Sequence, residues 1–323
     1  MMLSVEITDE TNRKPIPKRE IDFHLPAIVK HLALSGCYFM PNEHKLFRSI
    51  GMFFHYGYYL QNEELNESRF SVPPNCIYDP TEKSHFSNLI GKAIADFLSK
   101  KIDNSIFTIN YESALKVMRK RIKKANRPDL LAISRNNGIF AIEAKGSDRY
   151  TDYCMNKAKS QSKKSEFTVD FCVASVACKL YKKVECKYHR SMPDNNTISN
   201  GIKRDELLKG MNEAYRDYHS RFHKFIGKNH LNKKDCKFQG VEFYEIDLAY
   251  GLEECFDRSI LKAYSRFLKF YKPKLIVPKN IEKLSIEDSR QFEYNNEEIY
   301  IDSDGIGIKL DYDKEKSFFE QFD

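Results

Sequence analysis

The chain has 323 residues, with 53 lysines and arginines against 46 aspartates and glutamates, a formal net charge of +7. An apolar content of 41% and a charged content of 31% are typical of a globular protein with a substantial core, which excludes an intrinsically disordered chain. No apolar stretch has the length of a membrane span or of a signal-peptide core, and the eight cysteines form no CxxC pair. We therefore expect a cytoplasmic protein with free thiols, without a membrane anchor or a zinc ribbon.

The positive charge is concentrated in the middle of the chain. Residues 113–235 contain 28 lysines or arginines and 13 aspartates or glutamates, a net charge of about +15, whereas the flanking thirds are slightly acidic. A positive field of this size attracts a polyanion and speeds its encounter with the protein, so it favours a nucleic-acid partner. A solvated basic surface without a partner is the alternative.

Residues 1–80 are expected to form an α-rich N-terminal extension. After a short β-like start, residues 22–32 predict a helix around or after Pro26. Residues 47–60 are rich in aromatic side chains, which could stack on bases but at this density more often belong to a core or an oligomer surface. The Pro-rich segment at 71–75 is typical of a boundary.

Two elements and a basic segment precede the most informative part of the chain. Residues 85–98 have apolar side chains at helical spacing, and residues 105–110 predict the first core strand. The positive side chains that follow are expected to contact phosphates: Lys116, Arg119, Lys120, Arg121, Lys123 and Lys124.

A β-hairpin is then predicted around the turn at residues 135–138. Asp129 lies at the start of the apolar run before this turn, and Glu143 and Lys145 lie near the end of the run after it. Strand side chains alternate between the two faces of a sheet, so Glu143 and Lys145 share a face.

The turn determines where Asp129 lies. A three-residue loop with Gly138 in the left-handed conformation pairs Leu131 with Glu143 and Asp129 with Lys145, which brings all three charged groups to one face. A two-residue loop would move Asp129 to the opposite face. Two carboxylates that converge beside one ammonium group are unfavourable in a packed sheet unless a divalent cation binds there.

Pro128 and Asp129, followed after a gap by Glu143, Ala144 and Lys145, resemble the PD-(D/E)xK motif of restriction-endonuclease-like nucleases. The resemblance implies an α/β fold with a mixed central β-sheet flanked by helices. It also implies that Asp129 and Glu143, with the Ala144 carbonyl, bind Mg²⁺ or Mn²⁺ and that Lys145 is catalytic. Oxygen ligands suit both cations. The alternative is a hairpin whose charged residues only form salt bridges.

Further residues of the resembled site are suggested by the flanking helices. In that family the helix before the first core strand sometimes donates another acid, for which Glu82 or Asp96 would be candidates. A polar helix predicted over residues 153–164 carries Lys157 and Lys159 as further candidates for nucleic-acid binding. Gln161 corresponds to a glutamine that some members carry near the metal-bound water, with a plain surface glutamine as the alternative.

The rest of the chain is less informative. We predict a long buried strand over residues 167–183, where the resemblance ends, then a helix over 206–228, a strand over 241–247, a helix over 259–271 and a terminal hairpin over 300–309. His219 and His223 share a helix face that we expect to be basic and exposed rather than metal-binding. Asp302 and Asp304 lack the rest of an EF-hand loop, so calcium is not expected there.

We thus expect an N-terminal extension over residues 1–80, a nuclease domain over 81–275 and a C-terminal appendage over 276–323. The expected function is Mg²⁺-dependent cleavage of DNA by an endonuclease of restriction or anti-phage defence. This setting is favoured because no helicase, ATPase or target-recognition module is evident, which would suit an effector that works with a separate partner protein. A homo-oligomer is also expected. The alternatives are a non-catalytic nucleic-acid-binding or scaffold protein that retains the fold, and a nuclease that acts on RNA.

Overall fold

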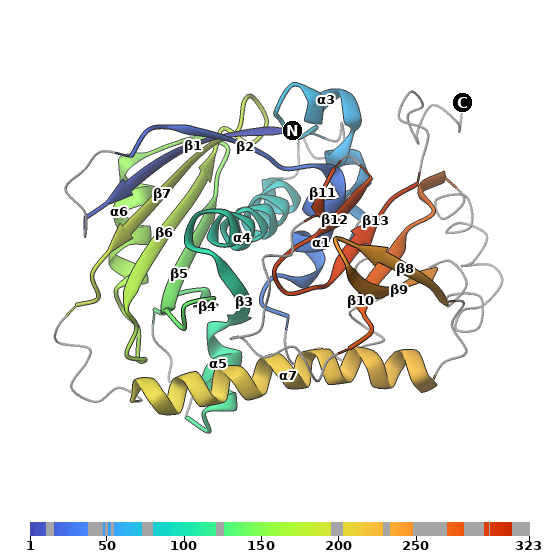
Figure 1. Cartoon of the computed structure of the whole chain (residues 1–323). Helices are drawn as coiled ribbons and strands as arrows, with labels where there is room; N and C mark the ends of the chain where they lie inside the picture. The colour runs from blue at the N-terminus through green and yellow to red at the C-terminus, as the bar shows by residue number, and fades with distance from the viewer. Residues whose placement is uncertain are drawn as a thin grey trace.

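Two β-sheets, of seven and six strands, form the framework of the protein in the computed structural model (Figure 1). The structure describes residues 1–10, 16–37, 48, 51–52, 55–72, 80–120, 126–194, 203–228, 233–247, 270–280, 294–296 and 298–311.

The seven-stranded sheet is mixed and has the order β2-β1-β7-β6-β5-β4-β3. Its strands are β1 (Met2–Asp9), β2 (Arg19–Asp22), β3 (Ser105–Asn110), β4 (Leu130–Ser134), β5 (Ile139–Gly146), β6 (Phe171–Cys178) and β7 (Glu185–Ser191). The pairs β1–β7 and β5–β6 are parallel and the others antiparallel. The prediction of a mixed α/β fold with a central sheet and flanking helices is therefore confirmed, as is the strand at residues 105–110.

Two local predictions for this sheet were incomplete. The buried strand expected over residues 167–183 ends at Cys178, because the chain turns at Lys179, whose φ is 55°, and returns as β7. The expected N-terminal extension also supplies two strands to the sheet. Ser4 to Asp9 of β1 pair in parallel with Glu185 to Arg190 of β7, and Leu3, Val5 and Ile7 are buried.

A helix covers each face of this curled sheet. Figure 1 shows α4 (Pro80–Asp103) on the concave side and α6 (Asp152–Ser162) on the outer side. The helices predicted over residues 85–98 and 153–164 are thus confirmed. A Cβ atom added to Gly91 would lie 2.3 Å from the backbone nitrogen of Gly146, so the backbone of α4 contacts the end of β5 directly.

The second sheet is antiparallel and has the order β11-β12-β13-β10-β9-β8. Its strands are β8 (Lys233–Phe238), β9 (Val241–Asp247), β10 (Lys274–Pro278), β11 (Tyr294–Asn295), β12 (Ile299–Ile301) and β13 (Gly307–Lys309). The strand at 241–247 and the terminal hairpin are confirmed. These strands come from both the expected nuclease domain and the expected appendage.

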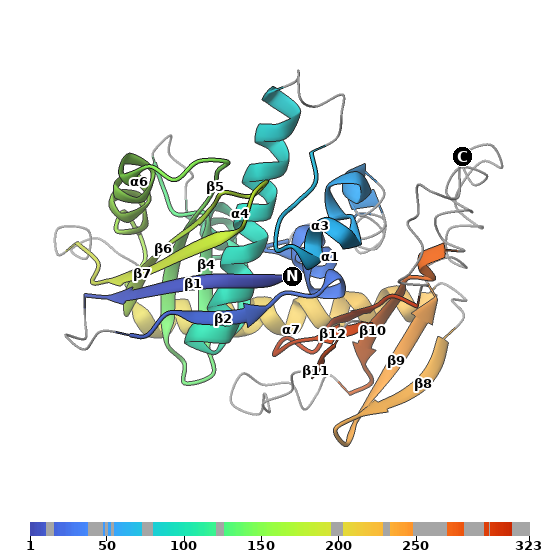
Figure 2. The same ribbon diagram turned by 90° about the horizontal axis from the view of Figure 1, so that it is seen from above.

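Helices connect the two sheets. Figure 2 shows α1 (Leu25–Leu34) between α4 and the second sheet, and α7 (Arg204–Lys228) passing both sheets. Every residue of α1 is buried. The shorter helices are α3 (Asn62–Asn66), α5 (Tyr111–Val117) and a 3₁₀ turn at Gly57–Leu60.

The aromatic segment at residues 47–60 is described only in part. The side chains of Tyr56 and Tyr59 are buried against the ring of Phe86, so these two aromatics belong to the core. Phe53 and Phe54, and the predicted helix at 259–271 except its last two residues, lie outside the described part of the chain.

The prediction that His219 and His223 lie on an exposed face of α7 is wrong. His219 is fully buried and its ring contacts those of Tyr215 and Tyr218, so the apolar face of α7 includes it. His223 donates a hydrogen bond of 2.6 Å to the carbonyl oxygen of Pro278.

A buried ionic cluster joins α1 and α4 to the turn between β12 and β13. Lys30 Nζ lies 2.7 Å from both Asp302 Oδ1 and Asp304 Oδ1, and Lys100 Nζ lies 2.9 Å from the Oδ2 atoms of the same aspartates. All four side chains are less than one-tenth exposed. Each lysine thus bridges both aspartates, which offsets the removal of these charges from water.

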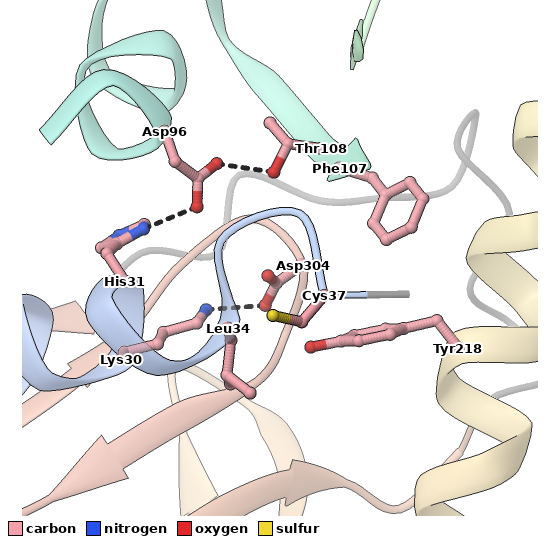
Figure 3. Close-up of a pocket in the computed structure, with 9 residues that line it drawn as sticks. All are labelled: Lys30, His31, Leu34, Cys37, Asp96, Phe107, Thr108, Tyr218 and Asp304. Carbon is pink, nitrogen blue, oxygen red and sulfur yellow. Dashed lines mark hydrogen bonds and ion pairs between the residues drawn. The ribbon is translucent and has the colours of Figure 1, made fainter. Parts of the chain in front are cut away.

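A hydrogen-bond chain continues this cluster. His31 lies between Asp96, at 2.8 Å, and the hydroxyl of Tyr300, at 3.1 Å, and Thr108 donates to Asp96 at 2.8 Å. Figure 3 shows His31, Asp96 and Thr108, with Lys30 and Asp304 of the ionic cluster, around a cavity of about 10 Å³, which is the space of about one water molecule. Burial lowers the pKa of His31 despite the nearby negative charge of Asp96.

Candidate metal and catalytic site

The hairpin between β4 and β5 sets the geometry of the candidate site. Ile133 pairs with Ile139 and Leu130 with Ile142, so the next step outward places Asp129 opposite Glu143. The expected pairing of Asp129 with Lys145 is therefore wrong by two residues. The left-handed residue of the turn is Asn137, with a φ of 57°, and not Gly138. A shift by two residues leaves every side chain on its face.

Asp129 is held by three hydrogen bonds at the start of β4. Its backbone N–H donates to the carbonyl of Ile142 at 2.9 Å, and its carbonyl accepts from the N–H of Tyr111 at 3.0 Å. Its carboxylate oxygen Oδ2 accepts from the N–H of Ala144 at 2.9 Å. The carboxylate is thus fixed across the hairpin, beside the strand that carries Glu143.

Glu143 is a carboxylate with too few partners. Its side chain is 0% exposed, its Oε1 contacts Lys145 Nζ, and its Oε2 has no hydrogen-bond partner among the described residues. Burial, followed by the negative charge of Asp129, raises the pKa of Glu143 to about 8, although Lys145 opposes the shift. Burial lowers the pKa of Lys145, but the Glu143 contact and the charge of Asp129 outweigh burial and raise it overall.

These residues fit an oxygen-ligated divalent cation. Asp129 and Glu143 provide carboxylate oxygens from neighbouring strands, and the buried, unpartnered Oε2 of Glu143 is an atom that a cation would complete. In the described part of the chain there is no group of three or more His, Cys, Asp or Glu residues that could hold a metal ion. A cation here would be held by these two carboxylates, with the carbonyl of Ala144 as the further ligand that the resemblance implies.

The two acids considered on α4 do not join this set. Ala174, which pairs with Glu143, belongs to a buried cluster with Met155 and Ala158 of α6, so the acidic face lies under α6 and away from α4. Glu82 lies 3.2 Å from His55. Asp96 accepts hydrogen bonds within the buried chain around His31.

Gln161 acts on the backbone next to Asp129. Its Nε2 donates a hydrogen bond of 2.6 Å to the carbonyl of Arg127, two residues before Asp129. The buried Arg127 side chain in turn makes an ion pair of 2.7 Å with Glu166. Gln161 thus holds the backbone two residues before Asp129. Its separation of 34 residues from Arg127 left no signal of this contact in the sequence.

Part of the basic segment can be placed beside the site. Tyr111, the first residue of α5, is bonded to Asp129, and Lys116 follows about 8 Å further along the helix axis. Lys116, Arg119 and Lys120 are exposed, whereas Arg121, Lys123 and Lys124 lie outside the described residues. On α6, Lys157 is exposed and Lys159 half-buried.

Comparisons with protein-family models, with curated proteins and with solved structures gave no match for this chain. Within the residues that the structure describes, no helix is long and apolar enough to cross a membrane.

Gln161→Leu should loosen the start of β4. The variant keeps the size of the side chain but leaves the Arg127 carbonyl without its donor, so hydrogen exchange of the Asp129 amide should accelerate roughly tenfold. Exchange measured by NMR tests this, with Asn156→Leu on the exposed face of α6 as the control. An unchanged Asp129 amide in Gln161→Leu would show that the hydrogen bond does not position this residue.

Glu143→Gln should change how stability depends on pH in the metal-free protein. Glu143 has an ordinary pKa of 4.5 and a folded value of about 8, so the folded state holds more protons between these values. Its free energy of unfolding therefore falls as pH rises through this window. Glutamine does not ionise, so its free energy of unfolding lacks this decrease. Between about pH 5 and pH 9 the free energy of unfolding of the variant should therefore rise relative to that of the wild type by on the order of 2 kcal/mol.

Chemical denaturation in EDTA at both pH values measures this gain. Glu213→Gln, at an exposed position of α7, is the control and should follow the wild type. Parallel pH profiles for Glu143→Gln and the wild type would contradict the raised pKa.

Proposed function

We propose that the protein is a metal-dependent nuclease of the PD-(D/E)xK type that hydrolyses phosphodiester bonds in DNA. The observation that carries the proposal is the convergence of Asp129, Glu143 and Lys145 on one sheet face, with one buried carboxylate oxygen left without a partner. A mixed sheet with α4 on one face and α6 on the other is compatible with a restriction-endonuclease-like core.

Each residue has a defined task in this proposal. Asp129 and Glu143 would hold Mg²⁺ or Mn²⁺ together with the Ala144 carbonyl, and Gln161 would keep Asp129 in place. The bound cation lowers the pKa of a water molecule and offsets charge on the phosphate. Lys145, which is 28% exposed, can orient that water or donate to a phosphate oxygen as negative charge builds.

The basic third of the chain supports a nucleic-acid substrate. Lys116, Arg119 and Lys120 are exposed on the segment that begins beside Asp129, where they can contact phosphates on either side of the scissile bond. RNA remains an alternative substrate, because phosphate contacts do not read the sugar. We propose restriction or anti-phage defence as the setting, with a partner protein and self-association as matters for experiment.

Glu143→Gln and Lys145→Ala should each reduce cleavage of plasmid DNA and oligonucleotides by about a hundredfold or more, since the first weakens a ligand of the metal ion and the second removes the group that acts on the water or the phosphate. Activity should require Mg²⁺ or Mn²⁺ and be lost in EDTA. Lys187→Ala, which changes a lysine on the same face two strands away, is the control. Cleavage by Lys145→Ala at the wild-type rate would refute the assignment.

Reversal of Lys120, Arg121, Lys123 and Lys124 to Glu should weaken DNA binding for every sequence. Because phosphate contacts release counterions, the variant should also show a flatter dependence of log K on log salt concentration. Fluorescence anisotropy at several salt concentrations measures both effects. Wild-type affinity and salt slope in this variant would place the nucleic acid on another surface. Binding without cleavage by the wild type would favour the non-catalytic alternative.

A further inference from the structure

We propose that Lys145 competes with the divalent cation for Glu143. In the metal-free protein the lysine stays on the Glu143 carboxylate, and binding of the cation releases it toward the phosphate. This inference rests on the proposed nuclease function and adds a control step to the same site.

The first observation is an imbalance of charge on the site face. Asp129 and Glu143 bring two carboxylates together, and Lys145 is the cation in contact with Glu143. One ammonium group offsets only part of the repulsion between these two carboxyl groups, and Oε2 of Glu143, which is buried, accepts no hydrogen bond from the described residues. A divalent cation balances both charges, so it satisfies the site better than the lysine does.

The second observation concerns the position of the ammonium group. Lys145 Nζ touches Oε1 of Glu143, which is the carboxylate that the cation needs as a ligand. While the ammonium group lies on this oxygen, it occupies the place that the cation needs and is held back from the phosphate. A cation on Glu143 removes the partner of Lys145 and repels its charge. Metal binding and release of the lysine are therefore coupled, and the coupling acts equally in both directions.

The chain offers a matched control for this contact. Lys145 pairs with Val176 and Val176 pairs with Lys187, so Lys187 lies on the same face, roughly 10 Å away across two strands. Lys187 makes its own contacts, with Glu6 at 3.6 Å and with the ring of Tyr150 at 4.1 Å. It can affect a cation on Glu143 only through long-range charge, which salt screens.

The first experiment measures Mn²⁺ affinity by calorimetry for the full chain. Lys145→Met, which keeps the length of the side chain without its charge, should bind Mn²⁺ about tenfold more tightly than the wild type. Lys187→Met should change the affinity by less than about twofold at 0.15 M salt. Asp129→Ala should lose most of the binding, which locates the cation.

The second experiment needs no variant and so does not depend on the folding of Lys145→Met. Acylation of lysine amines in the wild type, read by mass spectrometry, should modify Lys145 several-fold faster with Mg²⁺ than with EDTA. The rate at Lys187 should stay constant.

The outcomes separate the two proposals. If the wild type binds Mn²⁺ but Lys145→Met binds it equally or more weakly, and Mg²⁺ does not speed acylation of Lys145, the competition is refuted while the metal site stands. If neither the wild type nor Lys145→Met binds Mn²⁺, the metal site is refuted and the competition with it. Tighter binding by Lys145→Met together with faster acylation of Lys145 supports both.

Discussion

The arrangement of the two sheets depends on the ion pairs of Lys30 and Lys100 with Asp302 and Asp304. Four charges removed from water are tolerated because each lysine bridges both aspartates. The cluster fixes the C-terminal half of α4 to the terminal hairpin, while Gly91 sets its N-terminal half directly against Gly146. The helix that anchors the second sheet therefore also supports the end of β5, immediately after Glu143 and Lys145. Glu143 and Lys145 thus lie on one face of β5, and the opposite face of β5 packs against α4 in the core.

Local patterns predicted most of the elements but not their partners. The apolar stripe of α4, the strand β3 and the terminal hairpin follow from periodicity within one segment, so they could be read directly. The strand β7 was missed because Cys186 and Tyr188 are its only apolar residues, too few to stand out among the charged Glu185, Lys187 and Arg190. The pairing of β1 with β7 joins residues about 180 positions apart, and no pattern inside either strand specifies it. The burial of Lys30 and Lys100 likewise could not be predicted from the residues around them. A lysine is buried only when it is paired, and the aspartates that pair with these two are distant in the sequence.

For the candidate site, the face could be predicted more securely than the register. Alternation along a strand assigns Asp129, Glu143 and Lys145 to a face, and any register shift by an even number of residues preserves this assignment. The register itself depends on which residue of the turn takes the left-handed conformation, and Asn137 competes with Gly138 for that position. The hydrogen bond from Gln161 to the carbonyl of Arg127, near Asp129, depends on how α6 lies on the sheet, which no local pattern determines.

The parallel pairing of β1 with β7 also has a consequence for how the chain acquires its structure. During synthesis β1 is made first and β2 can pair with one of its edges early, yet β7, the strand on its other edge, is completed only after Ser191 has been added. Until then β1, which carries the buried residues Leu3, Val5 and Ile7, has no partner strand on that edge. At the usual pace of about 5–20 residues per second, this interval lasts roughly 10 to 40 seconds. The N-terminal strand is thus the one that most needs protection from association with other chains before the central sheet is complete.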